Sequence, residues 1–429
     1  MSGAMSGMSG APSDLDALAA RVRAAAEAAE RDDAHRPEFA EQLFELAIAL
    51  LDHHEFEEAA AASAEATRQL AWLAERDEQR WASVLARALR LHADALVELG
   101  LAEQALEVYQ RAAEIFADQA PSDASLWAEF AGNALNTGEC LRRMGRREQA
   151  LQNFDLALKG FREITFGEGG DGSQLPSVAL AQLDRGKVLL ELDRGDEAIA
   201  AIEQAVEIDA ALAERLPDRF ALAHAEALDT LSVALAELGR TEPALAAAEA
   251  ALRIVTDLAR EQPDRYVYPL ARMTNNFGRR LHDVGRLEQS ADVLGQAVSA
   301  FEVLARAQPR VHRDTLARVL ANRSNVLAEL DRHAQAYDVA QQAIELTEDP
   351  ALVIGGRRML ARLAFALDRR DDAIEQASAA MRGFAALLER EPAFAEAGQE
   401  LARELVELVR ACDAELPADA VAWVERLDE

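Results

Sequence analysis

Apolar side chains recur along this chain at helical spacing, in pairs of segments joined by a short polar turn. In the clearest pair, within residues 220–260, one apolar series comprises Leu222, Leu228, Leu231, Leu235 and Leu238, and the other comprises Leu245, Ala248, Ala251, Leu252, Val255 and Leu258. Such spacing places the apolar side chains on one face of each helix. The pattern predicts two amphipathic helices folded back on each other as a hairpin.

Small residues repeat in register with this hairpin over eight units. One series marks the second helix, at steps of 46, 45, 48, 46, 46, 46 and 37 residues: Ala59, Ala105, Ala150, Ala198, Ala244, Ser290, Ala336 and Ala373. Seven residues after each stands an alanine, and twelve residues before each stands another small residue: Ala47, Ala93, Gly138, Gly186, Ser232, Gly278, Ser324 and Ala361. Self-similarity at a fixed period is typical of stacked repeats, in which each unit buries its apolar face against its neighbours. We expect the small residues where the two helices of a hairpin, or a helix and the next hairpin, approach closely.

The polar turn between the two helices also recurs. Gly239 suits a left-handed C-cap, Thr241 an N-cap, and Pro243 the first turn of the following helix. Corresponding turns contain His54, Gly100, Gly145, Asp193, Gly285, Asp331 and Asp368. Prolines follow the second helix at a constant distance, which predicts that new units begin near Pro217, Pro263, Pro309 and Pro392.

These residues resemble the tetratricopeptide repeat, which has a small residue in its first helix, a glycine at the turn and alanines in its second helix. The resemblance covers about Pro37 to Pro392. The period of 46 instead of the usual 34 makes each helix longer by about one and a half turns, as in long-helix arrays of the kinesin light chain type and of bacterial proteins. The resemblance implies an all-α fold, a right-handed α-solenoid or superhelix of about eight hairpins with capping helices.

The chain divides into four predicted regions. Residues 1–12 are expected to be a disordered tail without signal-peptide character, and residues 13–33 a capping helix. Residues 34–392 hold the eight repeats, with a flexible glycine-rich loop at 167–175 and a break near 348–356, to which Gly355 and Gly356 contribute. Residues 393–429 are expected to form C-terminal capping helices, including a short piece with Val421, Trp423 and Leu427.

Composition narrows the possible functions. The formal net charge of −31 argues against binding to nucleic acid or to an anionic membrane. The two cysteines, Cys140 and Cys412, have no metal-ligand or redox spacing, so a reducing cytoplasmic location is expected. The His53–His54–Glu55 group fits a solvated turn, and Cys140 fits a buried structural thiol. We expect no catalytic residues, no metal and no cofactor.

The tetratricopeptide resemblance places first helices along a concave groove that presents side chains to a partner. Basic residues on or near this inner face include Arg142, Arg143, Arg358 and Arg362. The candidate partner-binding residues are Arg87, Arg90, Asn136, Lys187, Arg272, Asn275, Asn276, Arg279, Arg318, Asn322 and Asn325. Asparagine amides hydrogen-bond peptide backbone, and arginines bind carboxylates. Alternatively, the arginines pair with Glu98, Glu191, Glu237, Asp283 and Glu329, and the asparagines hold adjacent helices together.

The predicted function is that of a non-enzymatic adaptor or scaffold. Its groove would bind a peptide or helix of a partner protein, with an acidic or carboxylate-ended segment as the preferred ligand. The alternative is a regulator that senses a peptide or small ligand and acts on a separate effector chain. An enzyme would require a pocket with convergent titratable groups.

Overall fold

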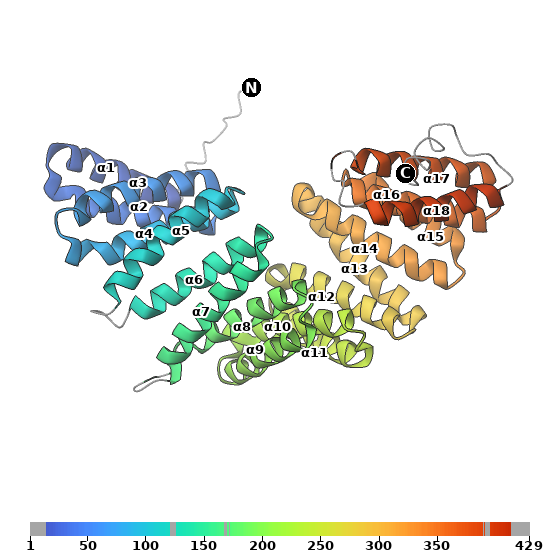
Figure 1. The fold of residues 1–429 in the computed structure, drawn as a ribbon, viewed down its shortest axis with the longest axis horizontal. Helices are drawn as coiled ribbons and strands as arrows, with labels where there is room; N and C mark the ends of the chain where they lie inside the picture. The colour runs from blue at the N-terminus through green and yellow to red at the C-terminus, as the bar shows by residue number, and fades with distance from the viewer. Residues whose placement is uncertain are drawn as a thin grey trace, which may run out of the picture. The chain divides into compact units, whose positions relative to one another are not determined.

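All regular structure in the described part of the chain is helical. The computed structural model describes residues 14–120, 126–166, 170, 172–388, 390 and 395–412. Within these residues it contains eighteen α-helices, one short 3-10 helix and no strand (Figure 1). The chain divides into two compact units, Met1–Leu212 and Ala213–Glu429. The all-α solenoid predicted from the sequence is confirmed.

The first unit begins with helix α1, Asp14–Arg31, and the 3-10 helix η1, Asp33–His35. Four hairpins follow, each made of a first and a second helix that pack against each other. They are α2 (Arg36–Asp52) with α3 (Phe56–Ala74), α4 (Glu78–Glu98) with α5 (Ala102–Gln119), α6 (Leu126–Arg143) with α7 (Arg147–Phe166), and α8 (Leu175–Glu191) with α9 (Gly195–Arg215).

The second unit has the same construction. Its hairpins are α10 (Pro217–Glu237) with α11 (Thr241–Glu261), α12 (Pro263–Asp283) with α13 (Leu287–Ala307), α14 (Pro309–Glu329) with α15 (His333–Leu346), and α16 (Pro350–Ala366) with α17 (Arg370–Leu388); helix α18 (Ala395–Ala411) follows. Helices α10 to α14 are each 21 residues long, as the long period predicted. Helices α10, α12 and α14 begin at the prolines that the sequence marked as unit boundaries.

Each hairpin turns through one residue with a left-handed backbone conformation. At Gly239 φ is +70°; its amide donates to the carbonyl of Ala236, and the Arg240 amide donates to that of Leu235. The same conformation occurs at His54, Gly100, Gly145, Asp193, Gly285, Asp331 and Asp368. Glycine reaches this conformation without steric cost, and aspartate tolerates it better than most residues. The left-handed conformation predicted for Gly239 is confirmed, but the C-cap of α10 is the preceding residue, Leu238. The N-cap assignment of Thr241 is wrong, because Arg240 is the N-cap of α11 and Thr241 is its first residue.

The small residues of the first helices allow the two helices of a hairpin to approach closely. A Cβ atom on Gly186 would lie 2.5 Å from the side chain of Ile202, and one on Gly278 would lie 2.8 Å from that of Leu294. Ala251 of the second helix is fully buried and belongs instead to an apolar cluster that α10, α11 and α12 form together. The small residue of the first helix therefore packs against the second helix of the same hairpin, and the alanine of the second helix packs against the next hairpin.

First helices of successive hairpins touch each other within each unit. Contacts join α2 to α4, α4 to α6 and α6 to α8 in the first unit, and α10 to α12, α12 to α14, α14 to α16 and α16 to α18 in the second. Among the residues that the model describes, no such contact joins successive second helices. First helices therefore line the inner side of each stack, where side chains one period apart meet.

The seventh hairpin departs from the regular pattern. Helix α15 has only 14 residues, seven fewer than α13, and α16 has 17, four fewer than α14. Since the linker between α15 and α16 is two residues longer than that between α13 and α14, these changes together give the 37-residue step. Gly355 and Gly356 were expected to belong to the break, but both lie inside helix α16. The expected tail at 1–12, part of the glycine-rich loop and the piece with Val421, Trp423 and Leu427 lie outside the described residues.

Candidate functional site

The eleven predicted groove residues all lie on first helices. Arg87 and Arg90 belong to α4, Asn136 to α6 and Lys187 to α8, and the other seven belong to α12 and α14. Most of them bond to a polar residue of a neighbouring first helix, about one period away in the sequence.

Asp229 of α10 is the centre of a buried inter-repeat contact in the second unit. Its side chain is only 2% exposed, and it accepts a hydrogen bond from Arg272 of α12. The Asn276 amide donates to both carboxylate oxygens of Asp229, at 3.0 Å each. A buried carboxylate requires such partners, because its desolvation is otherwise unfavourable. Arg272 and Asn276 therefore join two first helices, and Asp229 is the residue that the sequence did not single out.

The next contact along the same face links two asparagines. Asn322 of α14 donates to the Asn275 side chain of α12 at 3.1 Å, and Asn275 donates to Asn276 at 3.3 Å. These amides continue the contact that Asp229 begins. The asparagines of α12 and α14 thus fasten one first helix to the next, as the alternative interpretation of the sequence proposed.

Corresponding contacts join the first helices of the first unit. Arg87 and Arg90 of α4 bind Glu129 of α6, at 3.1 and 2.9 Å. Asn136 of α6 donates to Asp94 of α4 at 2.8 Å, and Tyr109 donates to the same oxygen. Burial raises the pKa of Asp94, and the two hydrogen bonds lower it only in part.

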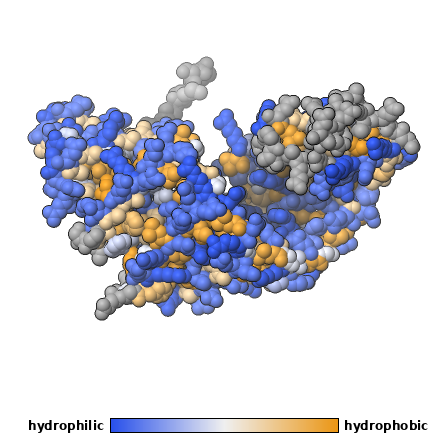
Figure 2. Space-filling model, in the orientation of Figure 1, coloured by the Kyte–Doolittle hydropathy of each residue, from blue (hydrophilic) through white to orange (hydrophobic). Residues whose placement is uncertain are grey.

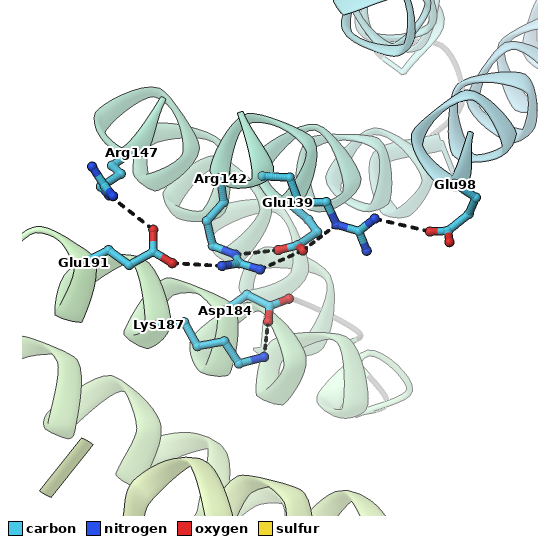
Figure 3. A network of polar contacts seen from close by, with 8 residues as sticks. Glu98, Glu139, Arg142, Arg147, Asp184, Lys187 and Glu191 are labelled. Atoms are coloured by element: carbon cyan, nitrogen blue, oxygen red, sulfur yellow. Dashed lines mark hydrogen bonds and ion pairs between the residues drawn. The ribbon is translucent and has the colours of Figure 1, made fainter. Parts of the chain in front are cut away.

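A larger network lies at the end of α6 (Figure 3). Arg142 bridges Glu139 of its own helix and Glu191 of α8, both at 2.8 Å, while Arg143 binds Glu139 and reaches Glu98 of α4 at 3.4 Å. Burial raises the pKa of Glu139, but the hydrogen bonds and charges of Arg142 and Arg143 outweigh it and leave the pKa lowered. The expected pairing of inner-face arginines with Glu98 and Glu191 is thus observed.

Lys187 lies beside this network in Figure 3 and binds Asp184 of the same helix at 2.9 Å. Burial raises the pKa of Asp184, and the ammonium group of Lys187 offsets part of this effect. The inner face of α4, α6 and α8 is therefore closely compensated in charge.

Three predicted residues remain available to a partner in the second unit. Arg279 and Asn325 are exposed, and the described residues offer neither a hydrogen-bond or ion-pair partner. Arg318 is also exposed, and its one polar contact among the described residues is with the Thr315 hydroxyl, at 3.5 Å. These three side chains can bind a ligand without first breaking an inter-repeat contact.

Three of the four hairpins in the second unit, those formed by α12 to α17, also separate charge between their first and second helices. The first helices α12, α14 and α16 contain eleven arginines and four acidic residues, a formal excess of seven positive charges. The second helices α13, α15 and α17 contain three arginines and eight acidic residues, an excess of five negative charges. The chain as a whole carries a net charge of −31, so these three basic helices could not be inferred from the total charge.

The remaining features are the hydropathy of the surface, the buried cysteine, and the search for metal-binding groups and membrane spans. Figure 2 shows a largely hydrophilic surface with smaller hydrophobic areas between the polar side chains. Cys140 is buried, as expected for a structural thiol. Among the described residues, no three His, Cys, Asp or Glu side chains gather closely enough to hold a metal ion. No helix in the described ranges is both long and apolar enough to cross a membrane.

This geometry defines an α-solenoid of long helical hairpins joined by polar contacts between first helices. Residues 179–212, within α8 and α9, match the family model of the tetratricopeptide repeat. This stretch of the chain is therefore a tetratricopeptide repeat, and the other hairpins have the same construction. No curated protein sequence matches the chain.

Many solved structures share the fold, and two of them cover about three quarters of this chain. A signal transduction ATPase of the STAND class with a tetratricopeptide repeat sensor, from Pyrococcus horikoshii, is 14% identical with a TM-score of 0.52; the match covers 76% of this chain and 46% of that protein. The apo form of RapI is 16% identical with a TM-score of 0.50, and the match covers 75% of this chain and 99% of RapI. At these identities the likeness concerns the fold alone.

Proposed function

We propose that this protein is a scaffold that binds an acidic segment of a partner protein on the inner face of its second unit. The observation that carries the proposal is the excess of seven positive charges on α12, α14 and α16 in a strongly acidic chain. Repeats of this family serve generally as protein-interaction modules. Electrostatic complementarity favours encounter with an acidic segment and disfavours other partners.

Arg279, Arg318 and Asn325 are the residues proposed to contact the segment. Guanidinium groups bind carboxylates through paired hydrogen bonds, and an asparagine amide both donates to and accepts from an extended backbone. Seven of the other eight predicted residues are assigned to contacts between first helices, and Lys187 to its ion pair with Asp184 of the same helix. This division follows from their partners, because a side chain already bonded to a buried carboxylate is costly to withdraw.

The proposal includes a non-enzymatic role in the cytoplasm. Cys140 and Cys412 are buried and form no disulfide within the described residues, which fits a reducing compartment. The net charge of −31 disfavours nucleic acid as the partner.

The proposal is tested with a fluorescein-labelled peptide in which glutamate alternates with glycine. Its anisotropy is titrated with the wild type and with the Arg279→Glu/Arg318→Glu variant. Reversing two exposed charges that contact the ligand should weaken binding about tenfold, or about 1.4 kcal/mol. Raising the salt from about 50 to about 500 mM should weaken wild-type binding as well, because the contacts are solvent-exposed.

The matched control is Arg253→Glu/Arg306→Glu, which changes the net charge equally on the second helices α11 and α13. This variant should bind within about twofold of the wild type, because its charges are remote from the inner face. Equal losses in both variants would show that only total charge matters. Absence of binding by the wild type at low salt would also overturn the proposal.

A further inference from the structure

A pocket of about 650 Å³ opens between helices α14, α15 and α16. Its size falls within the range of small-ligand sites in proteins. One cause is Gly355 of α16, which lies 37 residues after Arg318 and holds the corresponding register position. A Cβ atom on Gly355 would meet nothing within 4 Å. A glycine thus leaves space where the preceding first helix carries a long side chain.

The pocket has an apolar floor and a polar rim. Its floor is formed mainly by small or apolar side chains: Ala317, Ala321, Ala328, Ala340, Ala343, Leu352, Met359 and Leu363. The polar and charged residues that line it are His282, Ser324, Asn325, Glu329, His333, Arg358 and Arg362. Since Asn325 is exposed and the Arg362 side chain is 57% exposed, the pocket opens to solvent on the inner face. It is therefore continuous with the surface proposed above for the acidic segment.

The chain itself shows that the rim accepts a carboxylate. Glu404 of α18 binds Arg358, and its other oxygen lies 3.8 Å from Arg362. That separation is at the limit of an ion pair, so Arg362 keeps most of its donor capacity. A second carboxylate at this rim would meet Arg362 first.

We propose that this pocket receives one large apolar side chain of the acidic partner segment, and that Arg362 binds a carboxylate next to that side chain. The inference rests on the proposed function and specifies what the segment must contain. Transfer of an aromatic side chain from water to an apolar floor is favourable in proportion to the area buried. An arginine at the rim holds the adjoining carboxylate without moving it into the apolar floor.

The test compares two labelled peptides of equal length and charge. One contains glutamate and glycine only, and in the other a single central glycine is replaced by phenylalanine. The wild type should bind the phenylalanine peptide about tenfold more tightly, equivalent to about 1.4 kcal/mol. In Arg362→Gln this advantage should fall to about threefold, because the adjoining carboxylate loses its anchor.

Gly355→Leu fills the pocket from within. There is room for the added side chain, and leucine favours the helical conformation over glycine, so this variant should unfold at or above the wild-type temperature. It should bind the glycine peptide as the wild type does and lose most of the preference for phenylalanine. Ser299→Leu, an exposed position on the second helix α13, is the control and should keep the full preference.

The two levels of the proposal fail in different ways. Equal affinity of the wild type for both peptides would overturn the pocket and leave the acidic-segment scaffold intact. A full preference retained in Gly355→Leu would do the same, and a full preference in Arg362→Gln would remove Arg362 from the site. Failure of both peptides to bind would overturn the proposed function and the inference with it.

Discussion

Removing the Asp229 carboxylate should loosen the junction between α10 and α12. The carboxylate is buried and accepts hydrogen bonds from Arg272 and Asn276. Loss of one partner of a buried charged contact costs about 3–5 kcal/mol when the other charge stays buried. The Arg272 side chain is 33% exposed and recovers part of its hydration, so we expect Asp229→Ala to cost roughly 2–4 kcal/mol.

Arg279→Ala is the matched control on α12. Arg279 is exposed and has no partner among the described residues, so its loss should change stability by less than about 0.5 kcal/mol. Repeat arrays do not always unfold in one step. The assay therefore combines urea unfolding with hydrogen exchange measured separately for amides of α10, α12 and α16. Asp229→Ala should accelerate exchange in α10 and α12 more than in α16.

An Asp229→Ala variant as stable as Arg279→Ala would refute this reasoning. So would acceleration spread evenly over α10, α12 and α16. Either result would mean that the polar contacts between first helices contribute nothing to the stacking, and Arg272 and Asn276 would return to the list of candidate ligand-binding residues.

Three further predictions concern packing and pH. Gly356→Ala places a Cβ atom 2.2 Å from Ile344 and should lower the unfolding free energy by about 1–3 kcal/mol, whereas Gly355→Ala should raise it by up to about 1 kcal/mol; equal urea midpoints for the two variants would contradict this. Ala251→Leu should cost about 1–3 kcal/mol because the site is fully buried, and an unchanged melting temperature would disprove close packing there. Burial raises the pKa of Asp94 above its value in the unfolded chain, so the stability of the folded chain falls as pH rises from the unfolded pKa to the folded pKa. Asp94→Asn should therefore gain stability relative to the wild type as pH rises above about 4. A stability difference that does not depend on pH would contradict this prediction.

The sequence was sufficient to predict the hairpins because their determinants are local and repeat. Gly239 specifies a left-handed turn by its own conformational freedom, and Gly278 marks a close approach between the two helices of a hairpin. Thr241 was misassigned because the sequence locates the start of a helix only to within one or two residues. Gly355 and Gly356 were placed in a break because glycine generally disfavours helices. In the structure both are helical: Gly356 packs closely against Ile344, and Gly355 faces open space.

The site was predictable only in part, since the register identifies a face but not the partners on it. It placed Arg272 and Asn276 on the inner face, but burial of Asp229 depends on how closely α10 and α12 approach. Whether Arg279 has an ion-pair partner likewise depends on which carboxylates lie near it in the fold. The pocket lies between α14, α15 and α16, where the 37-residue step implied a shortened unit without showing that both α15 and α16 lose residues.

The most direct test of the account is to locate the acidic segment on the protein. A glutamate-rich peptide that carries a photoactivatable benzophenone is cross-linked to the full chain, and the attachment sites are mapped by mass spectrometry. Attachment within α12, α14 and α16, abolished in Arg279→Glu/Arg318→Glu, is the predicted result. Attachment on the second helices, or on the charge-compensated first helices α4, α6 and α8, would contradict it.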